Sequence, residues 1–453
     1  MTASFLSRAR VRRLRSSGAG FDCAIAAGAV AVCLLSCVQQ GPEAEHDVAT
    51  QPETTTEDAP APEADAPQPP DDAGSVADAE AEPDIPPGPP PELVACDAPL
   101  AWDACRVVVG PVRVTDPPTA FPDIAWTGSV FLVSAMGGRA GLEPGHVLAV
   151  VRPDGEVTAQ HVWPEMAQYP RVVMNPALGV ALATHGNGVR WLDVDAEVLG
   201  EASWTARETD HPEAAATPGG FLLLSGTGSY ECCSPEPLRV AHLGATPGPI
   251  EWEALPAAGP RSQAEHAVGD DGLASWVVSA AWDAGPAEAY PVLPSGRLGL
   301  PTDITFPGLA DVLGAAVFAG ALWVLRAESP YDDGRRYLQQ PGSTRPPLPL
   351  PLGNCWGPLE SVGDTLVLVR DCWEEGAGTF PHWVELQAVD RFTGALIGSP
   401  IVPAPADADF VRATRTPRGL GLVWADLSAV PLPDGGFLGP PGIAFARIDC
   451  CPE

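Results

Sequence analysis

The chain has 453 residues, of which 25 are basic and 58 acidic, and its formal net charge at pH 7 is −33. All of the basic residues are Arg, and the 53 Pro and 47 Gly exceed ordinary usage. A surface this acidic repels nucleic-acid phosphates and anionic lipid headgroups, which argues against nucleic-acid binding.

Residues 1–36 are predicted to be a lipoprotein signal peptide. A cluster of Arg residues between positions 8 and 15 precedes an apolar run, CAIAAGAVAVCLL, from Cys23 to Leu35. A basic segment followed by a short apolar one is the layout of a signal peptide. As a helix the run would span about 20 Å, short of the ~30 Å hydrocarbon core, which disfavours a permanent transmembrane helix.

The apolar run ends in Leu34-Leu35-Ser36-Cys37, which resembles the lipobox of bacterial lipoproteins. The resemblance implies that Cys37 is lipidated, becomes the mature N-terminus and attaches the protein to a membrane. Leu35 stands where a smaller residue is commoner, and an ordinary cleaved signal without a lipid is the alternative. Val38 follows the cysteine, so no Asp is present there to retain the protein at the inner membrane. By analogy with Gram-negative sorting, the expected address is the outer membrane.

Residues 37–95 are predicted to form a disordered acidic tether. The segment consists mainly of Pro, Ala, Asp, Glu, Thr and Gly, and it has hardly any large apolar side chains. Such a segment cannot bury enough surface to offset its chain entropy. Pro stiffens it and like charges extend it, so we interpret it as a spacer, with an acidic interaction tail as the alternative.

Residues 96–453 are predicted to form an all-β, seven-bladed β-propeller. One hairpin recurs: an apolar strand, a Gly-containing turn and a more hydrophobic strand. The seven hairpins begin at Pro122, Arg171, Pro212, Glu265, Asp311, Gly357 and Val411. Each is followed by a third strand and all but the last by a fourth. The repeat spacing of about 47 residues lies in the range of propeller blades.

The two ends of this domain predict how the ring closes. No fourth strand follows the last repeat, whereas the domain opens with an unpaired strand, Arg106–Thr115. Pairing it with the last strand, Ile443–Asp449, would close the ring and remove the open sheet edges. A pair of two-sheet sandwiches is the alternative.

The first repeat reads Pro-x-Ile-Ala-Trp-x-Gly…Phe-Leu-Val from Pro122 to Val133, with Arg-Pro-Asp-Gly at the next turn. This pattern resembles the blades of exported β-propeller proteins of GC-rich bacteria, clearly in the first repeat and less so in the fourth to sixth. The resemblance implies a fold and leaves the function open, because propellers host many activities.

The cysteine content predicts disulfide bonds. Of 11 cysteines, Cys23 and Cys33 lie in the leader and Cys37 follows it, so an even number remains in the exported domain. No pair of Cys-x-x-Cys motifs occurs, and Asp193-x-Asp195-x-Glu197 lacks the Gly and terminal Glu of a calcium loop. We therefore predict disulfides and no metal site.

One disulfide follows from hairpin register. Gly363-Asp364 reads as a two-residue turn, which places Cys355 opposite Cys372 at a separation suited to a disulfide. Pro358 lies at a ladder position of the first strand, where a bulge is expected.

The other cysteines are assigned by position. Cys105 begins the closing strand and is expected to bond one of the adjacent pair Cys450-Cys451, which follows the last strand. Cys96 is the candidate for the other. Cys232 and Cys233 remain, and a vicinal disulfide between them is the candidate pairing.

A repeated aromatic–acid pattern is the candidate ligand site. It follows the second strand of repeats three to six, as Tyr230-Glu231, Trp282-Asp283, Tyr331-Asp332 and Trp373-Glu374. In a propeller these loops share one face with the connections between blades, so they would form a rim of aromatic rings and carboxylates. Such a rim suits cations and sugars. The alternative is that the aromatics cover the sheet edge and the acids keep the loops soluble.

No Gly-x-Ser-x-Gly, His-Glu-x-x-His or phosphate-binding Gly loop occurs, so we do not expect an enzyme or a cofactor. We predict a monomeric binding or scaffolding module of the cell envelope, whose ligand is a glycan, a cation or an envelope protein. One alternative is an envelope hydrolase or lyase, favoured by a tight cluster of buried carboxylates at the channel mouth. The other is an outer-membrane assembly accessory resembling the propeller lipoprotein of outer-membrane-protein insertion, favoured by an apolar patch or exposed edge on the outer face.

Overall fold

The computed structural model describes residues 93–115, 119–137, 145–164, 169–204, 212–225, 239–255, 263–269, 271–280, 286–309, 312–328, 335–353, 355–373, 382–404, 408–426 and 442–453. The chain divides into two compact units, Met1–Pro86 and Pro87–Glu453, and every described residue belongs to the second. The predicted signal peptide, Cys37 and nearly all of the predicted tether lie outside the described residues. No described helix has the length and apolar character needed to cross a lipid bilayer.

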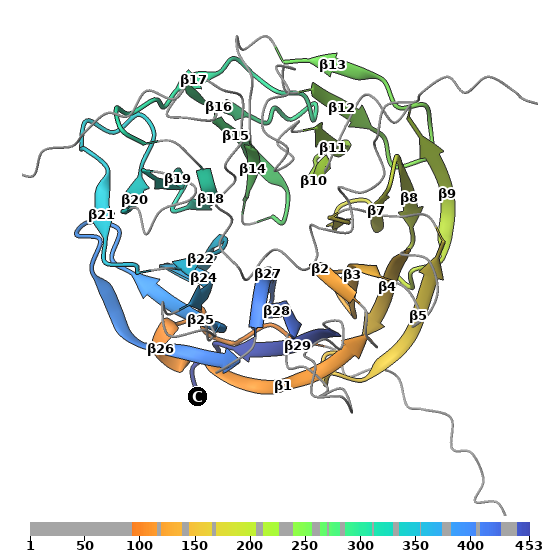
Figure 1. Cartoon of the computed structure of the whole chain (residues 1–453), viewed down its shortest axis with the longest axis horizontal. Coiled ribbons are helices and arrows are strands. Elements are labelled where there is room, and N and C mark those ends of the chain that lie inside the picture. Colours follow the sequence, from red (N-terminus) through yellow and green to blue (C-terminus); the bar gives the residue numbers. More distant parts are fainter. Residues whose placement is uncertain are drawn as a thin grey trace, which may run out of the picture. The chain divides into compact units, whose positions relative to one another are not determined.

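Strands β1 to β29 pair into seven antiparallel sheets that stand around a common axis like the blades of a propeller (Figure 1). Blade 1 contains β2 (Thr119–Trp126), β3 (Phe131–Gly137), β4 (His146–Val151) and β5 (Val157–Trp163). Blade 2 contains β6 (Val172–Asn175), β7 (Val180–His185), β8 (Gly188–Leu192) and β9 (Val198–Ser203). Blade 3 contains β10 (Pro212–Thr217), β11 (Gly220–Ser225), β12 (Arg239–Leu243) and β13 (Trp252–Ala254).

The remaining blades follow in chain order around the ring (Figure 1). Blade 4 contains β14 (Gln263–Val268), β15 (Ala274–Ala280), β16 (Ala287–Pro291) and β17 (Thr302–Asp303). Blade 5 contains β18 (Val312–Phe318), β19 (Ala321–Ala327), β20 (Arg336–Gln339) and β21 (Leu348–Leu350). Blade 6 contains β22 (Cys355–Trp356), β23 (Leu359–Val362), β24 (Thr365–Trp373), β25 (His382–Val389) and β26 (Leu396–Ala404). Blade 7 contains β27 (Ala408–Thr416), β28 (Gly419–Asp426), β29 (Gly442–Asp449) and β1 (Arg106–Thr115), and a 3-10 turn, η1 (Trp102–Ala104), precedes β1.

The core lies between the blades. Middle strands are mostly apolar and buried because each blade packs against a neighbour on both faces. Phe131, Leu132 and Val133 on β3 are fully buried. The outer strand β5 instead alternates between exposed and partly buried residues, as expected for a strand that borders solvent.

The ring closes as predicted. β1 pairs antiparallel with β29, from Arg106 opposite Asp449 to Thr115 opposite Ile443, and so becomes the outermost strand of blade 7. Figure 1 shows β1 running along the outside of the ring beside β29. The seven-bladed propeller is confirmed, and the ring of small sheets excludes the pair of sandwiches.

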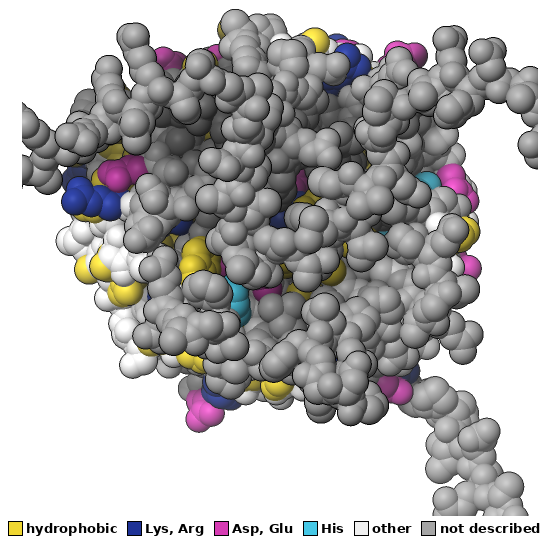
Figure 2. All heavy atoms as spheres, viewed as in Figure 1, with side chains coloured by type: hydrophobic (Ala, Val, Ile, Leu, Met, Phe, Trp, Pro, Cys, Tyr) yellow, Lys and Arg dark blue, Asp and Glu magenta, His cyan; other side chains and the backbone are white. Residues whose placement is uncertain are grey.

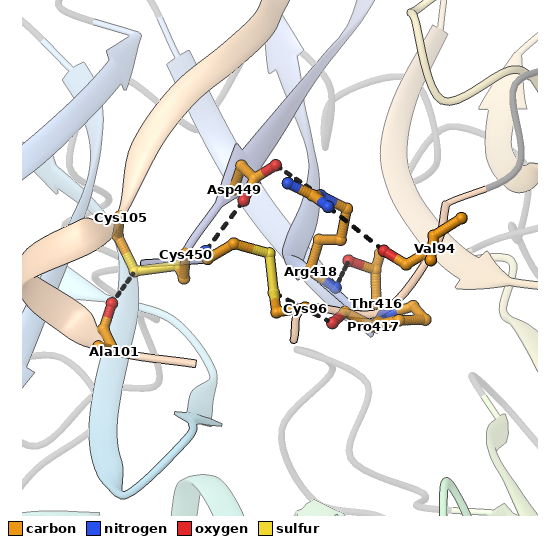
Figure 3. The surroundings of a disulfide bond; sticks show 10 residues. Val94, Cys96, Ala101, Cys105, Thr416, Pro417, Arg418, Asp449 and Cys450 are labelled. Atoms are coloured by element: carbon orange, nitrogen blue, oxygen red, sulfur yellow. Dashed lines mark hydrogen bonds and ion pairs between the residues drawn. A yellow bond between two sulfur atoms is a disulfide. The ribbon is translucent and has the colours of Figure 1, made fainter. Parts of the chain in front are cut away.

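Two disulfides, which we call the clasp, fix this closure (Figure 3). Cys96 bonds Cys451 and Cys105 bonds Cys450, with Cα–Cα distances of 5.5 and 3.8 Å. They join the segment before β1 to the two residues after β29. Both predicted pairings are confirmed, and the Cys232-Cys233 pair lies outside the described residues.

A third disulfide joins Cys355 and Cys372, as predicted from the turn, with Cα atoms 4.1 Å apart. The register is unbroken from this pair to Val362 opposite Thr365. The bulge expected at Pro358 is therefore wrong. The strand is interrupted between β22 and β23, but no residue is inserted, and the Pro358 carbonyl still accepts a hydrogen bond from Val369 N at 3.0 Å.

Candidate functional site

Only one residue of the predicted aromatic–acid rim can be placed. Trp373 ends β24 and stacks on His382 across the hairpin, with ring centroids 6.2 Å apart. The other predicted rim residues, Tyr230, Glu231, Trp282, Asp283, Tyr331, Asp332 and Glu374, lie outside the described residues. The rim as a whole stays a prediction.

A second set of residues lies at the ring axis. Five inner strands carry a charged side chain either within their first five residues or directly before the strand. These residues, which we call the axial cluster, are Asp123, Arg171, Glu213, Glu265 and Arg412. The first strand of every blade is innermost and the repeats run in the same sense around the axis, so the five side chains gather at one end of it. Viewed down this axis, acidic, basic and His side chains are visible near the middle of the molecule (Figure 2).

Contacts between blades hold part of the axial cluster in place. Arg171 of blade 2 binds Glu213 of blade 3 through two parallel hydrogen bonds, Nε to Oε2 at 2.9 Å and Nη2 to Oε1. This fork geometry is the strongest that a guanidinium and a carboxylate can form. Asp123 of blade 1 accepts a hydrogen bond from the backbone N of Val172 in blade 2 at 2.9 Å. Each of these side chains therefore fixes the position of the next blade.

Burial and mutual charge interactions shift the pKa values of the carboxyl groups in the axial cluster. Burial, followed by the negative charge of Glu213, raises the pKa of Glu265 to about 7. Burial also raises the pKa of Asp123, against the effect of Arg171. Burial opposes ionisation of Glu213 as well, but Arg171 outweighs it, so the pKa of Glu213 is lowered. Burial thus favours the neutral forms of Glu265 and Asp123, whereas Arg171 favours the charged form of Glu213.

A carboxyl pair lies beside the axial cluster, where blades 6 and 7 meet. The backbone N of Phe410 donates to both Asp371 Oδ2, at 2.9 Å, and Asp409 Oδ1, at 2.8 Å. Burial raises the pKa of Asp371 well above its usual range, and the charge of Asp409 and a hydrogen bond to it add to the rise. The protonated form of Asp371 is therefore favoured beside Asp409.

Three bulky residues near the axial cluster adopt left-handed backbone conformations. Phe121, Tyr169 and Phe410 have φ values of 50°, 50° and 52°. Their rings touch, with centroids 4.2 Å apart for Phe121 and Tyr169 and 4.6 Å for Phe121 and Phe410. Each lies two residues before a cluster member. Such conformations cost on the order of 1–3 kcal/mol each and concentrate at functional sites.

At the other end of the inner strands, Arg415 of blade 7 forms hydrogen bonds with blades 4 and 6. Its Nη2 donates to the carbonyl oxygens of Val268 and Gly269 in blade 4, at 2.6 and 2.7 Å. Its Nη1 donates to Ser361 Oγ in blade 6 at 3.3 Å. Burial raises the pKa of the nearby Glu360 to about 7, against the effect of Arg415. Arg415 follows Arg412 by three residues, about 10 Å along a strand. The hydrogen bonds of Arg415 therefore lie at a different level along the ring axis from the axial cluster.

The axial cluster has the chemistry of a polar binding site. Guanidinium and carboxylate groups recognise charged ligands with defined geometry. Within the described residues, the sole group of three potential metal-binding side chains with close ligand atoms is Cys355, Cys372 and Glu385. Both of those sulfurs are already joined in a disulfide. The axial cluster thus does not match a metal centre in the part of the chain that the structure describes.

Sequence reasoning missed the axial cluster, although a signal was present. Aligned on their turns, five of the seven hairpins carry a charged residue at the same place near the start of the first strand. A charge that recurs on a strand buried between blades calls for an explanation, because unpaired charges are rare there.

Comparisons with known proteins found low similarity to solved structures. No family model matches the chain, and no curated protein matches it. A quinonprotein alcohol dehydrogenase-like protein from Bacteroides thetaiotaomicron VPI-5482 is 10% identical, with a TM-score of 0.43 over 66% of this chain and 68% of that one. The Pan2 WD40 domain of Neurospora crassa is 9% identical, with a TM-score of 0.45 over 77% of this chain and 94% of that one. Identities this low carry no information about activity.

Proposed function

We propose that the chain is a lipid-anchored binding module of the cell envelope, whose ligand site is the end of the ring axis that carries the axial cluster. The observation that supports this is the recurrence of charged side chains on five inner strands, two of them locked by the bond between Arg171 and Glu213. Sites on a rigid scaffold hold their side chains in a defined geometry, as binding requires.

The predicted rim fits the same end of the axis. Trp373 ends β24, and Cys372 beside it pairs with Cys355 at the start of the inner strand of blade 6. In blade 6 the second strand therefore ends at the end of the sheet where the inner strand begins, which is the end that carries the axial cluster in the other blades. Aromatic rings around charged groups suit sugars and organic cations.

The proposed anchor is tested at Cys37. Full-length wild type should sediment with membranes, whereas Cys37→Ala should be recovered in the soluble envelope fraction, because the lipid carries the attachment. Cys33→Ala, four residues earlier in the leader, is the matched control and should stay with membranes. Membrane retention of the Cys37→Ala protein would remove the lipid anchor from the proposal.

The proposed site is tested by binding arrays. The Cys37→Ala protein is screened against glycans and organic cations, and then compared with Asp123→Asn and with the double variant Trp282→Ala, Trp373→Ala. Loss of a charged or stacking contact should weaken binding about tenfold or more. The control is Phe392→Ala, which removes an exposed aromatic residue away from the axis. Binding that survives in both site variants would rule out this end of the ring.

A hydrolase or lyase is the second candidate function, and the pair Asp371 and Asp409 is the observation that favours it. A carboxyl group whose pKa is raised, next to a second carboxyl group, is an arrangement that suits general acid–base catalysis. An activity screen with chromogenic glycosides and uronide polymers should then show turnover that Asp409→Asn abolishes. Turnover unaffected by Asp409→Asn, or none with any substrate, would leave binding as the better account.

A further inference from the structure

We propose that the axial cluster binds a zwitterion, a ligand that carries one ammonium and one carboxylate group. Glu265 would receive the ammonium group and Arg412 the carboxylate. This inference rests on the proposed function and specifies the chemistry of the ligand.

Three cluster members are already satisfied, and two are not. Arg171 and Glu213 bind each other, and Asp123 accepts the backbone N–H of Val172. Among the described residues, Glu265 and Arg412 have neither a hydrogen bond nor an ion pair within 4.0 Å. An ammonium group would stabilise the ionised form of Glu265, whose pKa burial raises to about 7, and a carboxylate would pair with Arg412.

The two unsatisfied charges belong to blades that are not neighbours in the ring. Glu265 lies on β14 of blade 4 and Arg412 on β27 of blade 7. They are close enough for Arg412 to counteract the rise in the pKa of Glu265, yet too far apart for an ion pair. A carboxylate and a guanidinium held apart in this way match the two ends of a zwitterion.

A neighbouring imidazole supplies a separate indication of a ligand. His266 Nδ1 is enclosed and has no hydrogen-bond partner among the described residues. Burial lowers the pKa of His266, whose ring is within electrostatic reach of Glu213, Arg171 and Arg412. A buried polar atom left without a partner calls for a bound molecule or water. A neutral imidazole can exchange one hydrogen bond with a ligand at this position.

The same charges argue against simpler ligands. A lone cation would satisfy Glu265 but leave Arg412 unpaired, and a lone anion would lie close to Glu213 and Glu265. A divalent metal needs several oxygen ligands, and only Glu265 among the cluster carboxylates is free of a described partner. A zwitterion satisfies both ends without adding net charge.

The test uses the full-length Cys37→Ala protein and calorimetric titration with probes of increasing charge separation. The zwitterions are glycine, β-alanine, 4-aminobutanoate, 6-aminohexanoate, diglycine and triglycine. The single-charge probes are butylamine and butanoate. We expect one zwitterion length to bind at least about tenfold more tightly than either single-charge probe, because each charged hydrogen bond adds to affinity. Preference for the peptides or for the free amino acids identifies the source of the zwitterion.

The variants Glu265→Gln and Arg412→Gln each remove one end of the site. Each should weaken zwitterion binding about tenfold or more, and the double variant should bind more weakly than either single variant, because each end of the ligand makes its own contact. The exposed residues Glu197 and Arg345 provide matched controls, Glu197→Gln and Arg345→Gln, which should bind as wild type does. Thermal unfolding checks that every variant is folded.

Zwitterion affinity that is equal in wild type, Glu265→Gln and Arg412→Gln would overturn the inference, as would single-charge probes that bind equally well. If no zwitterion binds while an array ligand is lost with Asp123→Asn, the inference fails and the proposed function stands. If neither zwitterions nor array ligands bind, both fail.

Discussion

His146 shows at the scale of a residue how blade packing controls protonation. The side chain is fully buried, and its Nε2 is hydrogen-bonded to Ser134 Oγ at 2.7 Å. Burial, together with the nearby His185 and Arg190, lowers the pKa of His146 to about 3. The folded protein therefore keeps this imidazole neutral far below its ordinary pKa of 6.5.

This shift predicts an acid-sensitive contribution to stability. Below pH 6.5 the unfolded chain binds a proton at His146 that the folded protein does not, so folding is weakened progressively between pH 6.5 and about 3. At pH 4.5 the loss should be about 2–3 kcal/mol. Urea unfolding at pH 7.5 and 4.5 measures it, with His146→Gln, which cannot titrate, as the comparison. Identical pH dependence in both proteins would contradict the prediction.

At the scale of an element, the inner strand of blade 6 depends on a glycine. Gly357 lies between β22 and β23 with a φ of 148°, and a Cβ there would meet the Val369 carbonyl oxygen at 1.9 Å. The following residue, Pro358, cannot donate to the ladder. The regular strand is therefore interrupted at Gly357-Pro358, although β22 and β23 pair with β24 in the same register on both sides.

Gly357→Ala should consequently destabilise the protein by about 3 kcal/mol or more, because backbone strain and a clash with backbone add together. Gly342→Ala is the matched control, since Gly342 also has a positive φ, 75°, but has open space at the Cβ position. It should cost about 1 kcal/mol. Thermal unfolding compares the two, and equal losses would show that the clash is relieved.

At the scale of the whole molecule, the clasp determines how firmly the ring is closed. Cys105 and Cys450 are 345 residues apart in sequence, so their bond removes a large amount of unfolded-chain entropy. Replacing all four clasp cysteines by Ser should lower stability by about 4 kcal/mol. Amide exchange should then speed up first in β1 and β29. The control is the double variant Cys355→Ser, Cys372→Ser, which should leave amide exchange in β1 unchanged. Faster exchange in β1 of this control would contradict the prediction that the clasp alone stabilises β1.

The architecture was predictable and the site was not, for physical reasons. Each hairpin carries its own alternation and turn, and ring closure needed only the unpaired strand Arg106–Thr115, so local signals sufficed. Even the bond between Cys355 and Cys372 followed from one turn. The axial cluster instead depends on contacts between blades: Arg171 and Glu213 are 42 residues apart, and Arg415 lies 146 residues from Gly269. Strand periodicity does not reveal which side chains meet at an axis.

The clasp also determines the path of mechanical load. Val94 lies just before Cys96, and its carbonyl oxygen accepts a hydrogen bond from Arg418 at 3.3 Å (Figure 3). Tension applied to the chain ahead of Val94 reaches the covalent bond from Cys96 to Cys451 before it reaches the hydrogen bonds of β1. Without the disulfides, such a force would act on the hydrogen bonds between β1 and β29. With them, the force is transmitted through the sulfur–sulfur bonds to the end of β29. A force applied at the N-terminal side of the domain is thus not expected to separate β1 from β29.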